Sequence, residues 1–453
     1  MAGVAHAYQY LARSELRQGN TSSLHLATSN PGSDASSHPH LYEGRFTAPR
    51  QAAALLSAVH LLVGSRFFTP ANSVAKAIAL ADPVITVNGE RLRFEGFSSC
   101  CSAYIRADFL PESHEGEVLG KGTTNVDFNL PTRSALARVR DEDGLALSVG
   151  HDAVHLTSGR DQIIERKVDL PLRWLRGMVE VQSYLANMRA TLRFSGIEAI
   201  QWFRHLPKGN THHTPLWLTQ VAGRLVSSTL DNPNGVRLSD TRRLRVLEPL
   251  LPFTQRVTVY ADAHQQASAW VLDLPGARLT LALSAEPWRA FSGEGQALQA
   301  LMHMQNHAKL PELRAQLHWQ ARLIASDLGE RLDMPLQQIQ QGLHVLGASG
   351  LLGFDLTDGC YFHRVLPFDL TALHDMHPRL AGASELLDSG CVTLHSLSPV
   401  TASVGKGDSV HAVREHDGQW RCTCPWYGKH QDERGPCKHV LAVEAAAAKA
   451  IPH

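Results

Sequence analysis

The sequence has no excess of charge of either sign. Its 453 residues include 43 Lys and Arg and 43 Asp and Glu, so the formal net charge at neutral pH is zero. Proteins that capture nucleic acid by bulk electrostatics need surplus cations, because binding releases counterions from the phosphates. The balanced charge therefore argues against that class of protein.

Long apolar runs and dense cysteines are also missing. No stretch approaches the roughly 18 consecutive apolar residues of a membrane span, and the N-terminus does not resemble a secretory signal. Seven cysteines are too few, and odd in number, for a disulfide-stapled secreted domain. We therefore expect a cytoplasmic protein, and the length is typical of about two to four domains.

Signatures of common enzymes are absent as well. There is no nucleotide-binding fingerprint, no G-x-S-x-G elbow and no zinc-deaminase motif. A polar loop between Lys121 and Asp127 lacks the spacing of a phosphate cradle. We expect no enzymatic activity; the alternative is an enzyme whose site lies near Lys121 and Asp127.

The first 300 residues combine strands with separate helices. Asn88 and Gly89 separate two β-rich runs and predict a hairpin. Helices are predicted over 49–66 and after Pro171, and further strands at 216–229, 256–260, 268–273 and 277–283. Antiparallel hairpins without alternating βαβ units indicate an α+β fold for residues 1–300, within a multi-domain chain.

Residues 311–366 have a different pattern. Helices are predicted over 313–323 and 335–347, followed by two short strands around Asp358 and Gly359. This order is typical of a winged helix, so we predict a winged-helix-like middle domain. Its expected core residues are Leu336, Ile339, Leu343 and Leu346.

The second of these helices lacks the cations of a DNA-reading helix. It carries four glutamines and His344 but no Lys or Arg, and the only charged side chains between 335 and 363 are Asp355 and Asp358. Without cations to contact phosphates, insertion into a groove gains little affinity. A protein-contacting or structural domain is the favoured interpretation, although glutamine can read adenine, which keeps DNA binding as an alternative.

After a connecting segment at 367–400, residues 401–453 contain a candidate metal site. Cys422, Cys424, Cys437 and His439 follow the pattern C-x-C-x12-C-x-H. The first two are expected on one face of a strand in a hairpin, and the last two at the start of an Ala-rich helix. Three thiolates and one imidazole favour a single Zn²⁺, and four protein ligands leave no position for an activated water. We therefore predict a C-terminal ββα finger with one structural zinc.

These residues resemble a known family. The segment around them resembles a SWIM-type zinc finger, with Cys422, Cys424, Cys437 and His439 at the four ligand positions. Stretches at 94–101, 120–129 and 291–295 are similar to bacterial SWIM zinc finger family proteins. The resemblance implies binding to DNA or protein. Because genes of such proteins often lie beside those of MoxR-type ATPases and von Willebrand factor A (VWA) domain proteins, it also implies a possible partner of that kind.

The charge of the finger favours a protein partner. Residues 405–453 contain seven basic and six acidic side chains, a net of +1, which is a poor footprint for duplex DNA. A cluster of cations and aromatics leaves three roles open: cover for the zinc site, a protein contact, or stacking of single-stranded bases. Its members are Arg421, Trp426, Tyr427, Lys429, His430 and Arg434. The leading hypothesis is a zinc-binding adaptor, and the alternative is a nucleic-acid-binding protein.

Overall fold

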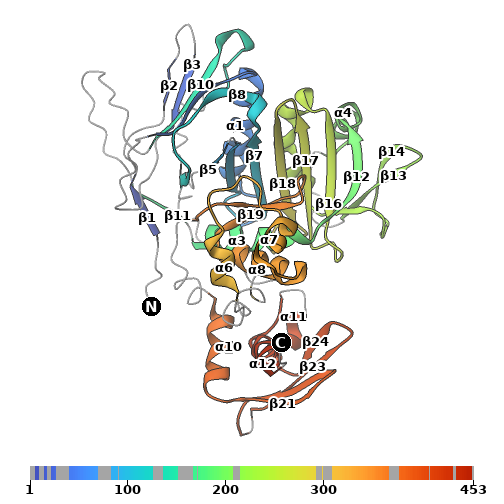
Figure 1. Ribbon diagram of the computed structural model, residues 1–453. Coiled ribbons are helices and arrows are strands. Elements are labelled where there is room, and N and C mark those ends of the chain that lie inside the picture. Colours follow the sequence, from blue (N-terminus) through green and yellow to red (C-terminus); the bar gives the residue numbers. More distant parts are fainter. Residues whose placement is uncertain are drawn as a thin grey trace.

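A computed structural model gives the arrangement of most of the chain (Figure 1). The described residues are 6–9, 15–17, 22–26, 40–69, 83–89, 91–125, 136–150, 167–170, 172–207, 215–291, 298, 309–366, 377–407, 409–431 and 435–450. Among the helices of these residues, none is both long and apolar enough to cross a membrane.

An antiparallel eight-stranded sheet forms the centre of the N-terminal region. In spatial order its strands are β12 (Arg189–Ser195), β16 (Arg256–Ala261), β17 (Ala267–Leu274), β18 (Ala277–Ser284), β7 (Ala103–Phe109), β6 (Arg91–Phe97), β5 (Val84–Asn88) and β9 (Gly122–Asn125). The predicted hairpin at Asn88 and Gly89 joins β5 to β6, with Gly89 at a φ of +62°. The α+β prediction is confirmed.

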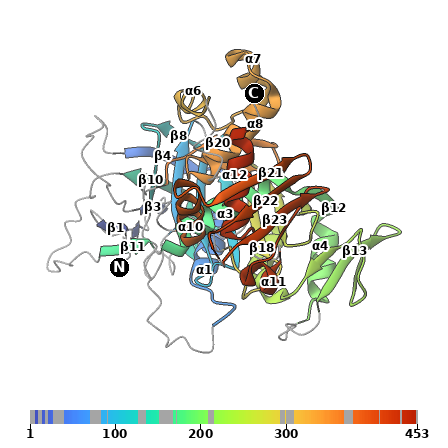
Figure 2. The same ribbon diagram turned by 90° about the horizontal axis from the view of Figure 1, so that it is seen from below.

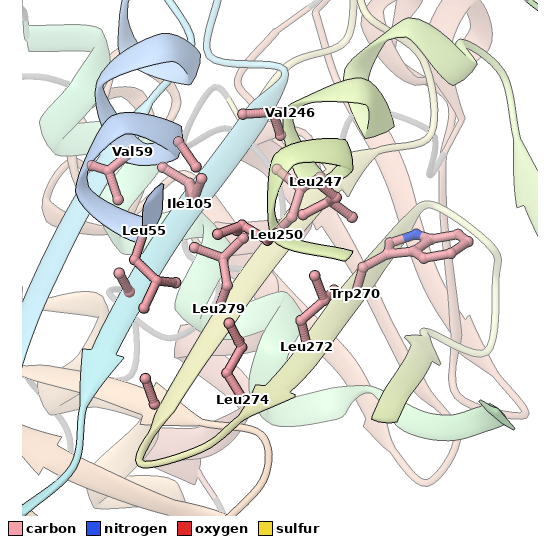
Figure 3. Close-up of a cluster of buried hydrophobic side chains, with 14 of the residues drawn as sticks. Leu55, Val59, Ile105, Val246, Leu247, Leu250, Trp270, Leu272, Leu274 and Leu279 are labelled. Atoms are coloured by element: carbon pink, nitrogen blue, oxygen red, sulfur yellow. The ribbon is translucent and has the colours of Figure 1, made fainter. Parts of the chain in front are cut away.

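Helices cover both faces of this sheet. One face is covered by α1 (Pro49–Val63), α4 (Gly196–Arg204) and the 3₁₀ helix η3 (Thr241–Phe253). Leu55 of α1 and Leu250 of η3 belong to the same buried cluster as Leu279 of the sheet (Figure 3). The other face is covered by α3 (Leu172–Asn187), whose Trp174 and Met178 are buried.

Smaller sheets flank the central one. A five-stranded sheet contains β2 (Glu15–Arg17), β3 (Ser22–Leu26), β10 (Leu145–Gly150), β4 (His40–Phe46) and β8 (His114–Val118), with one parallel pair, β3 and β10. A three-stranded sheet contains β14 (Arg224–Ser228), β13 (Leu216–Val221) and β15 (Val236–Leu238). The short strands β1 (His6–Gln9) and β11 (Lys167–Leu170) pair with each other.

Helices and a hairpin follow in the middle of the chain. They are α6 (Leu310–Ala315), α7 (Ala325–Leu332), α8 (Leu336–Ala348), β19 (Leu352–Asp355) and β20 (Cys360–His363). The helix predicted over 313–323 is wrong beyond Ala315, because Leu323 forms a β-bridge with Tyr361. Leu336, predicted in the core, is 49% exposed because it is the first residue of α8. The assignment of this unit as a winged helix stays a prediction.

Buried ion pairs attach the β19–β20 hairpin to the central sheet. Asp355 Oδ2 lies 3.6 Å from the Nη2 atoms of both Arg93 and Arg106, and all three side chains are at most 1% exposed. Asp358 in the turn lies 2.7 Å from Arg91 and 2.9 Å from Arg278. Burial alone would raise the pKa of Asp355, but Arg106 and Arg93 outweigh it and lower that pKa to about 2. The two aspartates therefore anchor the hairpin to the central sheet, although Thr357 and Gly359 of its turn are exposed.

The C-terminal module is built on a four-stranded antiparallel sheet. Its elements are α10 (Pro378–Asp388), β21 (Val392–Leu397), β22 (Val400–Val404), β23 (His411–His416), β24 (Gln419–Cys422), α11 (Pro425–His430) and α12 (Lys438–Ala450). The sheet therefore extends the predicted ββα unit with strands from the 392–404 segment. Leu380 of α10 and Leu441 of α12 form a buried cluster with Val179 of α3 and Ala348 of α8. Figure 2 looks onto this module, with its strands in front of α3.

Candidate metal centre

The structure brings the four predicted ligands together. One ligand atom from each of Cys422, Cys424, Cys437 and His439 can be chosen so that all four lie within 4.8 Å of one another. All four side chains are buried, with at most 9% exposed. Two ligands come from the end of a hairpin and two from the start of a helix, so the site joins the sheet to α12.

The hairpin supplies the first two ligands in a different way from the one predicted. Asp417 and Gly418 form its turn with φ values of +51° and +75°, and Cys422 is the last residue of β24. Cys424 is not on the strand, because Pro425 begins helix α11 and Cys424 is its N-cap. The strand end and the helix cap, not one strand face, direct the two sulfurs inward.

Backbone amides stabilise negative charge on two of the sulfurs. Tyr427 N donates to Cys424 Sγ at 3.4 Å, and Val440 N donates to Cys437 Sγ at 3.5 Å. Both amides belong to the first turn of a helix, where unpaired N–H groups favour a thiolate. A hydrogen bond from Cys422 lowers the pKa of Cys437 and raises that of Cys422, so of these two thiols Cys437 ionises first.

The donor set fits one zinc ion. In a zinc tetrahedron neighbouring sulfur and nitrogen ligands are about 3.6–3.8 Å apart. His439 Nδ1 lies 3.9 Å from Cys422 Sγ and 4.0 Å from Cys437 Sγ, so a small contraction around the ion gives that geometry. Three sulfurs and one nitrogen fill all four positions, so the site is that of a structural zinc, which would cross-link β24, α11 and α12.

A second layer of contacts holds the ligand-bearing segments. The Arg379 guanidinium carbon lies 4.6 Å from the centroid of the Trp426 ring, and Arg379 Nη1 donates to the carbonyl of Pro436 at 2.7 Å. Tyr427 Oη donates to the carbonyl of Trp420 at 2.7 Å. Trp426 and Tyr427 are half-buried against the finger core, which supports the interpretation that they cover the zinc site.

The comparisons with known proteins agree with this geometry. The SWIM zinc finger family matches residues 403–448, a span that includes all four ligands. Residues 403–448 form a SWIM zinc finger. The family match covers the SWIM finger alone, and no curated protein matches the sequence of the chain.

Two solved structures resemble part of the chain weakly. The crystal structure of proliferating cellular nuclear antigen from Entamoeba histolytica has a TM-score of 0.32 and 10% identity, covering 54% of this chain and 98% of that protein. The DnaN sliding clamp (DNA polymerase III subunit beta) from Bartonella birtlesii, bound to griselimycin, has a TM-score of 0.31 and 14% identity. It covers 53% of this chain and 65% of the clamp. At these TM-scores the likeness supports no conclusion about this protein.

The structure also shows where some of the other residues singled out from the sequence lie. Near Lys121, Thr123 lies on β9, where its Oγ1 is 3.1 Å from Thr86 Oγ1 and accepts from Val365 N at 3.2 Å. Asp127 and Arg434 lie outside the described residues. Arg421 and Lys429 are exposed. Sequence reasoning missed Arg379, which has no motif and lies far from the ligands along the chain.

Proposed function

We propose that the chain is a non-enzymatic adaptor whose SWIM finger binds a protein partner. The observation that carries this proposal is the burial of a closed four-ligand site beneath an exposed surface. A zinc ion with four protein ligands cannot activate water or polarise a substrate. Its effect is to order the surface around it, and ordered surfaces serve recognition.

The middle unit gives little support to DNA reading. Helix α8 carries no cation, and its C-terminal half is mostly buried against α3 and the hairpin. The two aspartates of the hairpin are paired with arginines of the central sheet. In the finger, Arg379 lies over the Trp426 ring and leaves it a poor stacking platform for bases.

The identity of the partner stays a prediction. The resemblance to bacterial SWIM proteins implies a MoxR-type ATPase or a VWA-domain protein. The enzyme alternative places an active site in the N-terminal region, near Lys121, and stays a prediction. DNA binding by the finger is the other alternative, for which Arg421 and Lys429 are among the exposed cations.

Cross-linking on the finger tests the adaptor proposal. The full chain is used as bait in a cell extract with an amine cross-linker, and cross-linked peptides are identified by mass spectrometry. We expect a stoichiometric protein linked to Lys406 and Lys429, which are exposed on the finger. Capture should be lost in Cys424→Ser and kept in Cys391→Ser, whose sulfur lies outside the ligand cluster.

A DNA titration distinguishes the adaptor proposal from the nucleic-acid-binding alternative. Fluorescence anisotropy with single- and double-stranded DNA is measured across a salt series. The adaptor proposal expects weak binding that does not change when Arg421 and Lys429 are replaced by Gln. Tight binding that falls steeply with salt and is abolished by those replacements, without any protein cross-linked to the finger, would establish the nucleic-acid alternative.

A further inference from the structure

Two arginines lie side by side on the outer face of the finger sheet. Arg414 of β23 and Arg421 of β24 are directly paired in the strand register. Their neighbours Val413 and Cys422 are buried in the finger core, so the arginines project from the opposite, solvent-facing side. Both are exposed. Paired positions on antiparallel strands are about 5 Å apart, so the two guanidinium groups share one small area.

Among the residues that the structure describes, the surroundings leave both guanidinium groups available. Within the described residues, neither arginine forms an ion pair or a side-chain hydrogen bond. Thr401 is the cross-strand neighbour of Arg414 on β22 and is short. Of the described acidic groups nearby, Asp417 Oδ2 lies 3.4 Å from His416 Nε2, and Glu415 accepts from Gly418 N at 2.6 Å.

The pair does not stabilise the fold. Like charges directly opposite on a sheet are destabilising. No acidic side chain of the described residues offsets this repulsion. An anion bound between the two guanidinium groups would remove it, and a planar pair of oxygens matches the guanidinium fork.

We propose that Arg414 and Arg421 bind a carboxylate-rich segment of the protein partner. This inference rests on the adaptor function and adds the chemistry of the partner. A protein carboxylate is favoured over nucleic acid for two reasons. The face carries no Phe, Tyr or Trp among its described residues to stack a base, and two cations neutralise too few phosphates to hold a duplex.

A peptide titration tests this inference. The zinc-loaded full chain is titrated into a fluorescein-labelled peptide rich in Asp and Glu, and into its Asn and Gln counterpart. We expect the acidic peptide to bind at least about tenfold more tightly than the neutral one. The double variant R414Q/R421Q should weaken binding of the acidic peptide by about tenfold or more. Higher salt should weaken the wild-type interaction.

Matched controls separate the site from general charge. R189Q/R224Q removes two other exposed arginines, on β12 and β14, and should bind like the wild type. R414K/R421K keeps the charge but loses the fork, so it should retain part of the affinity. Zinc content and the far-UV circular dichroism spectrum show that each variant is folded.

Three results would overturn the inference. They are no preference for the acidic peptide, equal binding by R414Q/R421Q, and a preference for a DNA oligonucleotide that the same variant abolishes. A failure of this inference can be distinguished from a failure of the adaptor function. If Cys424→Ser loses a cross-linked partner that R414Q/R421Q retains, the finger binds protein through another surface and only the arginine assignment is wrong.

Discussion

Cys424 combines two roles in a single residue. Its sulfur is one of the four converging ligand atoms, and it accepts the Tyr427 N–H as the N-cap of α11. Serine is a good N-cap residue but cannot supply a thiolate. A Cys424→Ser change therefore removes the metal ligand while it keeps the helix cap.

Cys424→Ser should reduce zinc affinity by more than about 100-fold. The measurement is zinc content by mass spectrometry after dialysis against a series of chelator concentrations. Cys391→Ser is the control, because Cys391 is a half-buried free cysteine whose sulfur lies 3.0 Å from Ser389 Oγ and away from the cluster. Equal zinc retention by both variants would remove Cys424 from the ligand set.

His363 should make stability depend on pH. Burial lowers its pKa to about 4, and its Nδ1 accepts from Trp319 N at 2.7 Å. Because the folded-state pKa lies below the unfolded value of about 6.5, the unfolded chain binds more protons between these values. The stability from neutral His363 is present above pH 6.5 and is lost as the pH falls toward 4. Between pH 7.5 and pH 5 we expect a loss of about 2 kcal/mol.

Urea unfolding of the wild type and His363→Asn at pH 7.5 and pH 5 tests this dependence. Asparagine keeps an acceptor near the Nδ1 position but does not titrate. The zinc ligands are the same in both proteins, so the difference in pH dependence belongs to His363. An identical pH dependence in the two proteins would contradict the assignment.

At the scale of elements, Asp355 fixes the β19–β20 hairpin to the central sheet. Asp355→Asn keeps the side-chain oxygen that accepts from Thr357 N and Asp358 N, at 3.0 and 3.1 Å. It removes the negative charge between Arg93 and Arg106, which are fully buried. Loss of one partner in a buried ion pair costs about 3 kcal/mol or more.

We expect Asp355→Asn to lower the free energy of unfolding by about that amount. Hydrogen exchange should also rise in the hairpin and the adjoining end of α8. Urea unfolding and hydrogen-exchange mass spectrometry measure both effects. Asp327→Asn on the exposed part of α7 is the matched control. If the two variants were equally stable, the ion pairs would not be what fixes the hairpin.

Elements with strong local signals could be predicted from the sequence. The Asn88-Gly89 and Asp417-Gly418 turns and the apolar face of α3 are read directly from residue types. The irregular segment after Ala315 could not, because the Leu323 bridge to Tyr361 is a tertiary contact. The elements α10, β21 and β22 were not predicted from the sequence either.

At the scale of the whole molecule, the order of strands in the central sheet could not be predicted. β18 pairs with β7 across a long stretch of chain, and no local pattern specifies that pairing. The candidate site was easier to predict, because the type and spacing of its ligands indicate the metal that they bind. The contacts around the ligands, such as that of Arg379 with Trp426, depend on tertiary packing and could not be predicted from the sequence.

Zinc removal should loosen the C-terminal module and leave the central sheet intact. The site joins β24, α11 and α12, and α12 packs through Leu441 on α3 and α8. On chelation we expect amide exchange about tenfold faster, or more, in residues 409–450, with β6, β7, β17 and β18 unchanged. Added Zn²⁺ should restore the protection and Mg²⁺ should not. Unchanged protection of α12 without metal would show that zinc does not hold the module together.

X-ray absorption spectroscopy of the zinc-loaded full chain tests the central claim most directly. That claim is a closed structural zinc centre formed by Cys422, Cys424, Cys437 and His439. It predicts one zinc per chain with three sulfur ligands at about 2.3 Å and one imidazole nitrogen at about 2.0–2.1 Å. A spectrum with two sulfurs or fewer, or with a water oxygen in the coordination shell, would contradict it.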